Sequence, residues 1–547
     1  MYLSTTVGLA LIGSLLCVPC EAETVNNVAI IGAGAAGSSA AFHLRKYALE
    51  EKIAINITVF EKTDRVGGRS LTVPAYNNPS LPIELGASIF VGANRILVNA
   101  SRQFQLPLSQ PHRLEKDDLT AIWDGVDFVF QTTEGSWGGW DLVKMFWRYG
   151  LSPYRVKKLI DSMIGEFLKL YEDPYFPFKS LSQRAEQLGL NRFTSLTGEQ
   201  ILKNANIDPR FAREILQVAT RVNYASNLAY IHGLETLVSL ATDNAMSVET
   251  GNWRIFDEMI LDSGATIYRN VTVASIEKSK TETETQPSSS SKYIIATKDA
   301  DSKDGATEHF DVEFDNVIIA NPWQFSNIKA GEGVLDREID EIPYTKLHVT
   351  LFASPLELSP EFFGLKPGSK APATVYTTLA EGEEAGQGAD GVGRTGFYSI
   401  STLKYVTNPE TGQKERVYKI FSPKAVTAEL LTRILGTEVP EPVVSGKEQN
   451  EHISWYYPHS FYAYPIELPR VTFEDPVIGS GVYYTSGIES FISCMETSAF
   501  MGRNVARLVA DSLAGISHPD EPFVVIHDKG SLGEGVEGIK VQVEGEL

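Results

Sequence analysis

The chain has 547 residues, which is too long for one hydrophobic core, so we expect two or more domains. Its residues are 43% hydrophobic and 21% charged, as in a globular protein. The formal net charge of -21 disfavours binding to nucleic acid and to anionic lipid surfaces, because both repel a negative chain.

The first 22 residues resemble a secretory signal peptide. The uncharged apolar run 7–18 is too short to cross a bilayer, which takes about 20 residues, and Ala22 offers a cleavage site. No Lys or Arg precedes the run, so a retained anchor and a buried N-terminal helix stay open as alternatives. Cleavage would remove Cys17 and Cys20 and leave Cys494 as the single thiol, so no internal disulfide could form.

A secretory route makes glycosylation sequences relevant. Asn56, Asn99 and Asn270 each open an Asn-x-Ser/Thr sequence. Asn56 falls in an expected strand, so we do not expect it to be modified. We expect the protein in the secretory pathway, ending in a lysosome, in a vacuole or outside the cell.

Residues 28–61 predict a strand, a glycine turn, a helix and a second strand. Gly32, Gly34 and Gly37 have the spacing of a dinucleotide-binding turn. The first glycine allows the tight turn, the second lets the backbone approach a pyrophosphate, and the third lets the helix pack on the sheet. Glu61 ends the second strand and can accept hydrogen bonds from ribose hydroxyls. An α/β crossover without ligand is the structural alternative.

The next segments favour FAD over NAD. Gly67, Gly68 and Arg69 predict a second glycine turn and a guanidinium close to the first phosphate site. Such an arrangement suits a cofactor that extends past its pyrophosphate, and the stretch 84–88 (ELGAS) would let the backbone approach its second half. No second Gly-x-Gly-x-x-Gly sequence predicts a nicotinamide domain, so dioxygen is the simplest electron acceptor.

The middle of the chain changes character several times. Apolar residues at three-to-four spacing predict that residues 110–245 are mostly helical. The remaining expected elements are a helix at 252–264, a strand pair at 265–279, a mobile hairpin tip at 278–292, a buried strand at 314–322, β-rich segments at 345–470 and a solvated loop at 379–394.

The last segment, 481–513, predicts a strand, a loop and a long helix. Gly487 gives a further turn, Glu489 an acid, and the helix begins near Met495. A helix N-terminus can stabilise negative charge that develops on a reduced flavin. The candidate cofactor-binding residues are therefore Gly32, Ala33, Gly34, Ala36, Gly37, Glu61, Lys62, Gly68, Arg69, Gly86, Ala87, Ser88, Val273, Gly487, Glu489 and Met495.

These motifs resemble the glutathione-reductase-type FAD superfamily, in the branch of flavin amine oxidases and phytoene desaturases. Further stretches narrow the resemblance to the prenylcysteine oxidases, also called prenylcysteine lyases: FWRYG at 146–150, RVNY at 221–224, YKIFS at 418–422, YPH at 457–459 and the segment 483–499. The likeness spans residue 25 to about residue 514. The sequence IESFISC at 488–494, the hairpin tip and the tail depart from the family pattern, which bears on substrate preference more than on flavin binding.

The resemblance implies an α/β fold, with a Rossmann-like FAD-binding domain and a mixed α+β substrate domain. The boundaries that we expect are a signal peptide at 1–22, a discontinuous FAD-binding domain at 25–110, 226–340 and 471–515, a substrate domain at 111–225 and 341–470, and a tail at 516–547. It also implies a lysosomal thioether oxidase that cleaves farnesyl- or geranylgeranyl-cysteine with O2 and water. The products would be cysteine, a prenyl aldehyde and hydrogen peroxide, and the isoprenoid would need an apolar tunnel.

Catalytic side chains are harder to identify. Asn223 and Tyr224 are weak candidates to face the flavin, with a buried core pair as the alternative, and His459 is a weak candidate to orient the substrate or water. We expect Cys494 to be a buried, inert thiol and expect no metal site, because no His-x-x-x-His or Cys-x-x-Cys pattern occurs after the signal peptide.

Two other functions stay open at this point. One is a flavin oxidase acting on amines or amino acids, and the other is an inactive, secreted FAD-binding carrier. The sequence indicates neither the length of the isoprenoid nor the oligomeric state.

Overall fold

The computed structural model describes residues 25–110, 115, 117–132, 139–279, 292–300, 307–444 and 450–517. The predicted signal peptide and residues 518–547 of the predicted tail lie outside the described residues, as do residues 280–291 of the predicted hairpin tip. Among the described residues, no helix combines the length and the apolar character needed to cross a bilayer.

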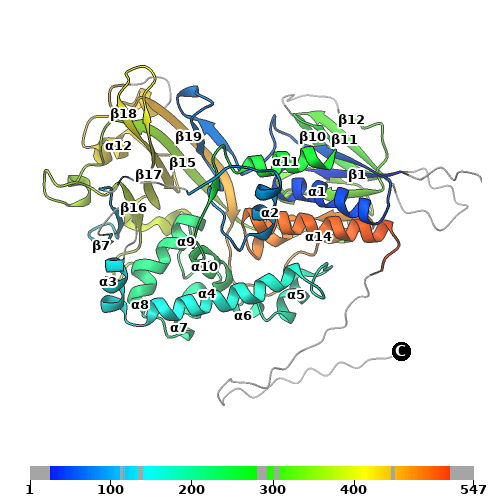
Figure 1. Cartoon of the computed structure of the whole chain (residues 1–547), viewed down its shortest axis with the longest axis horizontal. Helices are drawn as coiled ribbons and strands as arrows, with labels where there is room; N and C mark the ends of the chain where they lie inside the picture. The colour runs from blue at the N-terminus through cyan, green and yellow to red at the C-terminus, as the bar shows by residue number, and fades with distance from the viewer. Residues whose placement is uncertain are drawn as a thin grey trace, which may run out of the picture.

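A six-stranded sheet forms the centre of one half of the molecule, with strand order β20-β21-β13-β1-β2-β9 (Figure 1). All neighbours pair in parallel except β20 and β21. Its strands come from all three segments of the expected FAD-binding domain. Their bounds are β1 Asn26–Ile31, β2 Ile55–Phe60, β9 Thr266–Tyr268, β13 Asn316–Ile319, β20 Val477–Gly479 and β21 Val482–Tyr484.

Alternate residues of β1 face different layers, because side chains along a strand point to opposite faces. Val28 and Ile30 pack with helix α1 (Ala35–Glu50), whereas Ala29 and Ile31 pack with a second sheet. Helices α11 (Trp253–Ser263) and α14 (Met495–Leu513) lie beside α1 (Figure 1). The parallel sheet is therefore covered on both faces, which explains the continuous apolar run of β1.

The second sheet has the strand order β12-β11-β10-β14. The expected strand pair at 265–279 is wrong in its pairing: β9 joins the six-stranded sheet, whereas β10 pairs antiparallel with β11. Asn270, with a φ of 58°, separates the two strands and turns the chain from one sheet to the other. The bounds of this sheet are β10 Val271–Lys278, β11 Tyr293–Asp299, β12 Glu308–His309 and β14 Lys329–Ala330.

The other half of the molecule combines a seven-stranded sheet with a layer of helices (Figure 1). The strand order is β19-β15-β18-β17-β16-β6-β7. Their bounds are β6 Thr120–Trp123, β7 Phe128–Gln131, β15 Tyr344–Ser354, β16 Thr374–Thr377, β17 Ser399–Thr407, β18 Lys414–Ser422 and β19 Trp455–Pro465. The helices are α3 Gly139–Tyr149, α4 Ser152–Leu168, α5 Leu181–Gln187, α6 Asn191–Thr194, α7 Gly198–Asn204, α8 Pro209–Phe211, α9 Gln217–Tyr224 and α10 Gly233–Leu240.

The expectation that residues 110–245 are mostly helical is wrong for their first part. β6 and β7 form a hairpin around an Asp-Gly sequence at 124–125, and β6 pairs with β16. Alternating β-branched and aromatic residues beside Asp-Gly are a hairpin signal that the helical pattern of the following residues obscured. The shorter elements are α2 Arg95–Gln103, α12 Ala428–Leu435, α13 Glu441–Val444, β3 Thr72–Pro74, β4 Pro82–Glu84, β5 Leu108–Ser109 and β8 Ser247–Val248.

Arg221 holds the expected solvated loop 379–394 against the helices. Its fully buried guanidinium donates to the carbonyl oxygens of Thr377, Gly391 and Val392 and to the side chain of Asn227. Gly391 and Val392 near the end of the loop are therefore buried, whereas the stretch 381–390 is mostly exposed. A buried charge needs such a full set of acceptors, so Arg221 has a structural role.

Helix α1 makes close backbone contacts on two sides. A Cβ on Gly37 would lie 1.9 Å from the carbonyl oxygen of Gly32, and a Cβ on Gly502 of α14 would lie 2.1 Å from that of Ala36. Both positions therefore require glycine, and together they fix α1 between β1 and α14.

We predict that Gly502→Ala destabilises the protein by about 1–3 kcal/mol or more, because the added methyl forces α14 away from α1. Thermal unfolding measures this as a lower melting temperature. Gly165→Ala is the matched control: Gly165 lies within α4 with no atom near its added Cβ, so the change is expected to be neutral or stabilising. Equal melting temperatures for Gly502→Ala and the parent protein would contradict the prediction.

Candidate functional site

The glycine turn after β1 leaves the start of α1 open. Gly32 has a φ of +104°, and Gly34 is the N-cap of α1, where no side chain caps the helix. A Cβ on Gly34 would meet only the Cα of Gly68, at 3.9 Å. Free N–H groups and the positive end of the helix dipole therefore face a space that suits a phosphate group.

Glu61 lies buried at the end of β2, beside this turn. Its Oε2 accepts from the N–H of Ala33 at 2.8 Å, and its Oε1 accepts from the N–H and hydroxyl of Thr63 at 2.9 and 2.7 Å. A carboxylate has about four acceptor positions, so one position stays available for a donor such as a ribose hydroxyl. Lys62 follows and is exposed, and the N–H of Val271 donates to the Glu61 carbonyl, which brings the start of β10 and Val273 near.

Two further glycine turns stack on the first. The N–H of Gly67 donates to the carbonyl oxygen of Ala33 at 2.9 Å, and a Cβ on Gly68 would lie 3.2 Å from the Cα of Gly34. A Cβ on Gly86 would lie 2.1 Å from the carbonyl oxygen of Arg69. These contacts place the predicted segments 32–37, 67–69 and 86–88 side by side in this order, and we call them the row of glycine turns.

Arg69 joins this row to the C-terminal segment. Its guanidinium lies 2.6 Å from Glu489 Oε2 and donates to the carbonyl oxygen of Ala463 in β19. Glu489 is buried in the helical turn 486–490 and also accepts from the hydroxyl of Tyr344. Gly487 belongs to the same turn, where a Cβ would lie 2.4 Å from the carbonyl oxygen of Glu474.

Lys419 is a site residue that the sequence analysis missed. It is buried on β18, and its Nζ donates to Ser88 Oγ at 3.1 Å and to the Glu84 carbonyl at 3.0 Å. Burial lowers its pKa to about 8, and burial raises the pKa of the Glu84 carboxyl to about 7. Lysine in the alternating strand sequence YKIFS was the available signal, because an inward-facing lysine needs a partner.

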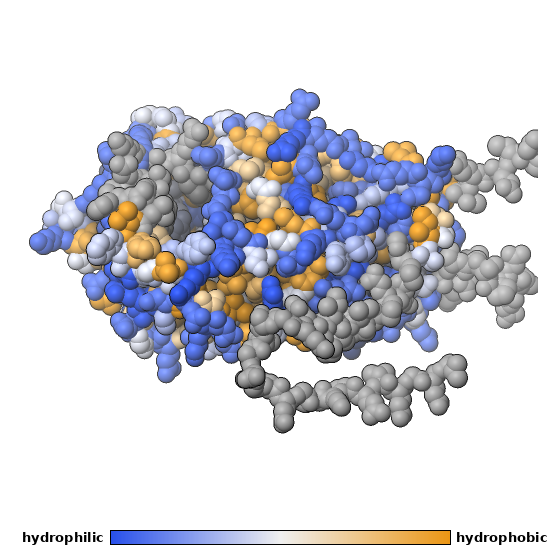
Figure 2. Space-filling view, turned by 60° about the horizontal axis from the view of Figure 1, so that its bottom comes forward, coloured by the Kyte–Doolittle hydropathy of each residue, from blue (hydrophilic) through white to orange (hydrophobic). Residues whose placement is uncertain are grey.

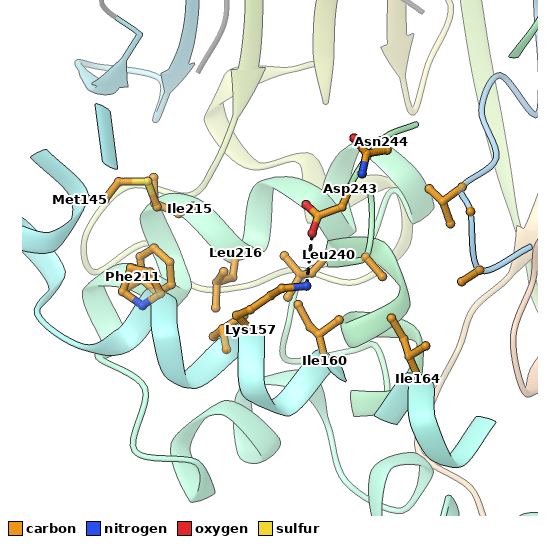
Figure 3. A pocket seen from close by; sticks show the side chains of 16 residues that line it. Met145, Lys157, Ile160, Ile164, Phe211, Ile215, Leu216, Leu240, Asp243 and Asn244 are labelled. Atoms are coloured by element: carbon orange, nitrogen blue, oxygen red, sulfur yellow. Dashed lines mark hydrogen bonds and ion pairs between the residues drawn. The ribbon is translucent and has the colours of Figure 1, made fainter. Parts of the chain in front are cut away.

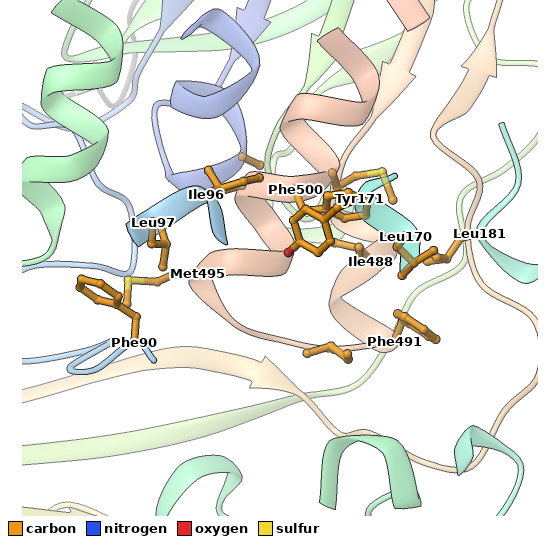
Figure 4. Packing of buried hydrophobic residues seen from close by; sticks show 14 of the residues in the cluster. Phe90, Ile96, Leu97, Leu170, Tyr171, Leu181, Ile488, Phe491, Met495 and Phe500 are labelled. Atoms are coloured by element: carbon orange, nitrogen blue, oxygen red, sulfur yellow. The ribbon is translucent and has the colours of Figure 1, made fainter. Parts of the chain in front are cut away.

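The start of α14 lies at the other end of the row of glycine turns. Met495 packs near Phe90 and Leu97 (Figure 4). Cys494 is the N-cap, its Sγ lies 3.3 Å from Thr497 Oγ1, and burial raises the pKa of its thiol to about 11. A neutral thiol is a poor nucleophile, which agrees with the expectation of an inert cysteine.

Glu496 ties α14 to the start of α2. Its carboxyl accepts from the N–H groups of Ile96 and Leu97, at 2.8 and 3.0 Å, and from the hydroxyl of Tyr171. The ring of Tyr171 packs on Phe500 with centroids 4.5 Å apart (Figure 4). Burial raises the pKa of Glu496 to about 7.

A buried acidic cluster lies beside the start of α14. Glu235 Oε1 accepts from the N–H of Ser493, and His232 Nε2 lies 3.3 Å from Glu467 Oε2. Burial and the neighbouring Glu467 raise the pKa of Glu235 to about 8, burial raises that of Glu467, and burial lowers that of His232 to about 4. Burial therefore favours the neutral forms of the side chains in this cluster.

The structure separates the weak catalytic candidates. The ring of Tyr224 packs on Tyr464 with centroids 5.4 Å apart, and Asn223 donates to the carbonyl oxygen of Ser239. His459 lies on β19 between the rings of Tyr457 and Phe461, and burial and Arg65 lower its pKa. Five residues of strand separate His459 from Tyr464, which is roughly 17 Å. His459 therefore lies on a different part of β19 from Tyr464, the residue whose ring packs on Tyr224.

An apolar pocket of about 470 Å³ opens in the helical layer (Figure 3). Its walls come from α3, α4, α10 and the turn 212–216, and the loop 91–93 closes one side. That loop begins three residues after Ser88, so the pocket and the row of glycine turns are neighbours along the chain. Lys157 Nζ and Asp243 Oδ2 pair at 3.2 Å at its rim.

Comparison with known families gives two matches. A family model described as prenylcysteine lyase matches residues 132–519, and a model described as an NAD(P)-binding Rossmann-like domain matches residues 30–100.

Comparison with curated proteins gives full-length relatives. Farnesylcysteine lyase of Arabidopsis thaliana is 28% identical and prenylcysteine oxidase 1 of Mus musculus is 26% identical, with 89% and 88% of both chains covered in the respective alignments.

Comparison with solved structures identifies the fold. A putrescine oxidase variant has a TM-score of 0.52 at 15% identity, covering 89% of this chain and 98% of its own. Cyclohexylamine oxidase from Brevibacterium oxydans has a TM-score of 0.51 at 16% identity, covering 89% and 99%. These similarities confirm the expected α/β fold with a Rossmann-like domain.

We predict that Gly34→Val abolishes binding of the expected FAD, because the branched side chain would fill the space at the start of α1. The absorbance ratio of flavin to protein in purified protein measures this loss. Gly165→Val, on the surface of α4, is the control and is expected to keep full flavin content. A folded Gly34→Val protein with full flavin content would refute this placement of the phosphates.

The buried carboxyls predict a pH dependence of stability. In the folded protein burial raises the pKa values of Glu84, Glu235 and Glu496 to about 7, about 8 and about 7, above the ordinary glutamate value of 4.5. The folded state therefore binds more protons than the unfolded state, and stability falls as pH rises through these values.

We expect the melting temperature to rise as pH falls from 8 to about 6.5. Below pH 6.5 the lowered pKa values of His43 and His232, about 3 and about 4, oppose a further gain in stability, because these histidines bind protons more readily in the unfolded state. Glu235→Gln should reduce the slope, because it removes one titrating carboxyl. A melting temperature that falls between pH 8 and 6.5 would contradict the account.

Proposed function

This chain belongs to the prenylcysteine lyase family, and we propose that it is an FAD-dependent thioether oxidase that cleaves prenylcysteine. The overall reaction consumes prenylcysteine, O2 and water and yields cysteine, a prenyl aldehyde and H2O2. The carbon between sulfur and the allylic double bond loses a hydride, water adds to the resulting cation, and the hemithioacetal collapses. The carbon–sulfur bond breaks in this last step, and the sulfur takes a proton.

The observation that carries the cofactor assignment is the uncapped start of α1 beside Gly34 and Gly68. In this proposal the N–H groups of Ala35 and Ala36 hold the pyrophosphate, Glu61 holds a ribose, and Arg69 with Glu489 lies against the middle of the cofactor. FAD bound there would supply a two-electron acceptor for the hydride that can be reoxidised by O2.

The chain's own residues then orient the substrate and exclude water. Lys419 fixes the loop 84–88 through Ser88 and the Glu84 carbonyl. The buried ring of Tyr224, the partly buried ring of Tyr464 and the neutral thiol of Cys494 provide an apolar wall beside the start of α14. Hydride loss from this carbon needs no strong base. The protein therefore has mainly to position the substrate and to exclude bulk water.

We place the isoprenoid in the apolar pocket of the helical layer. Its lining of aliphatic and aromatic side chains, such as Ile160, Ile215 and Leu240, suits a hydrocarbon chain (Figure 3). The pocket lies next to the loop that follows Ser88, so a bound prenyl chain would direct its thioether toward the row of glycine turns.

We also propose that the protein reaches a lysosome or vacuole through the secretory pathway. Its apolar N-terminal run supports this, and Asn99 and Asn270 are exposed and accessible to glycosylation. Asn56 is also exposed, although it lies in β2 and its amide donates to Asn27.

The test is an anaerobic half-reaction of the purified yellow protein. We expect farnesylcysteine to bleach the flavin absorbance at about 450 nm. Admission of air should restore the absorbance, and peroxide, farnesal and cysteine should be released in equal amounts. Putrescine and free amino acids should leave the spectrum unchanged. Bleaching by an amine would support an amine oxidase, and no bleaching by any of these compounds would support a carrier.

A further inference from the structure

The outer faces of α3 and α4 carry a concentrated group of exposed apolar side chains. Of the fifteen large hydrophobic side chains exposed among the described residues, five lie within twelve residues of the chain. They are Val143, Phe146, Trp147, Leu151 and Tyr154, which we call the α3–α4 patch, and Trp147 is 86% exposed. Figure 2 shows apolar side chains between hydrophilic ones on the face that carries these helices.

The spacing of the α3–α4 patch indicates that its exposed apolar side chains on α3 form a continuous face. Val143, Phe146 and Trp147 lie on one side of α3, at spacings of three and four residues from Val143, whereas Leu151 lies between the two helices and Tyr154 lies on α4. Met145, Tyr149 and Val156 on the opposite side are buried in the helical core. The helix α3 is therefore apolar on both faces, although only one face is covered by the described part of the chain.

The segment that carries the α3–α4 patch is basic, whereas the whole chain is acidic. Residues 143–158 contain five basic residues and no acid, whereas the chain carries 69 acidic and 48 basic residues. The basic residues are Lys144, Arg148, Arg155, Lys157 and Lys158. Arg148 and Lys157 pair with Glu214 and Asp243, and Arg155 and Lys158 are exposed. The overall negative charge argues against contact with anionic lipid. This segment is basic and can make such a contact locally.

We propose that the α3–α4 patch docks the protein on a lipid bilayer that contains anionic headgroups. Tryptophan and tyrosine favour the boundary between headgroups and hydrocarbon, and basic residues beside them are attracted to anionic lipids. A single patch holds the protein in the plane of the membrane and does not span it.

The position of the α3–α4 patch gives the docking a role. Met145, Pro153, Val156 and Lys157 of the same two helices line the apolar pocket, so these helices form a wall between the pocket and the docked face. A prenylated amino acid dissolves in a bilayer through its hydrocarbon chain. Docking would bring the pocket close to a substrate dissolved in the bilayer, a role that rests on the proposed function, whereas lipid binding itself does not.

The experiment measures binding of the full chain to vesicles, without substrate. Sedimentation with vesicles of phosphatidylcholine containing 30% phosphatidylglycerol should recover the parent protein in the pellet, with weaker recovery for pure phosphatidylcholine and at high salt. The double variant Phe146→Ser/Trp147→Ser should bind about tenfold more weakly or worse. Its flavin content and melting temperature should equal those of the parent, because both side chains are exposed.

The matched control is Leu49→Ser/Leu261→Ser, which removes two side chains that are 71% and 64% exposed on the other half of the molecule. It should bind vesicles like the parent. No binding of the parent to the anionic vesicles, or equal binding of parent and Phe146→Ser/Trp147→Ser, would overturn the proposal. A parent dimer that this variant converts to monomer, with no vesicle binding, would overturn it in favour of self-association. None of these readouts depends on turnover.

Discussion

The close approach of α1 to its neighbours is the constraint on which the rest of the site depends. Gly37 lets α1 lie against the carbonyl of Gly32, and Gly502 lets α14 lie against the carbonyl of Ala36. The start of α1 therefore faces the turns at 67–69 and 86–88, and α14 delivers Cys494 and Met495 to the same region. A longer side chain at either glycine would move a helix and with it one wall of the proposed FAD site.

Much of this arrangement follows from local sequence patterns. Three glycines between a buried strand and an alanine-rich helix, with Glu61 at the end of the next strand, identify a dinucleotide cradle from the sequence because each residue has a distinct steric or polar role. The hairpin β6–β7 and the split of β9 and β10 between two sheets were not foreseen, because strand partners lie far apart in sequence and periodicity does not name them. The His232–Glu235–Glu467 cluster was missed for the same reason, since tertiary packing alone buries it, whereas Lys419 left a signal in the strand sequence YKIFS.

Charge illustrates how whole-chain quantities can mislead. The net charge of -21 argues against anionic lipid, yet residues 143–158 carry only basic charges. The buried carboxyls provide a second contrast, because their raised pKa values favour the folded state in acid.

A crystal structure of the yellow protein with farnesylcysteine would test the central claim most directly. The account predicts pyrophosphate density against the N–H groups at the start of α1, an isoalloxazine ring between Ser88 and the start of α14, and the isoprenoid in the pocket between α3, α4 and α10. Side chains filling the space beside Gly34 and Gly68, with the dinucleotide bound elsewhere or absent, would contradict it.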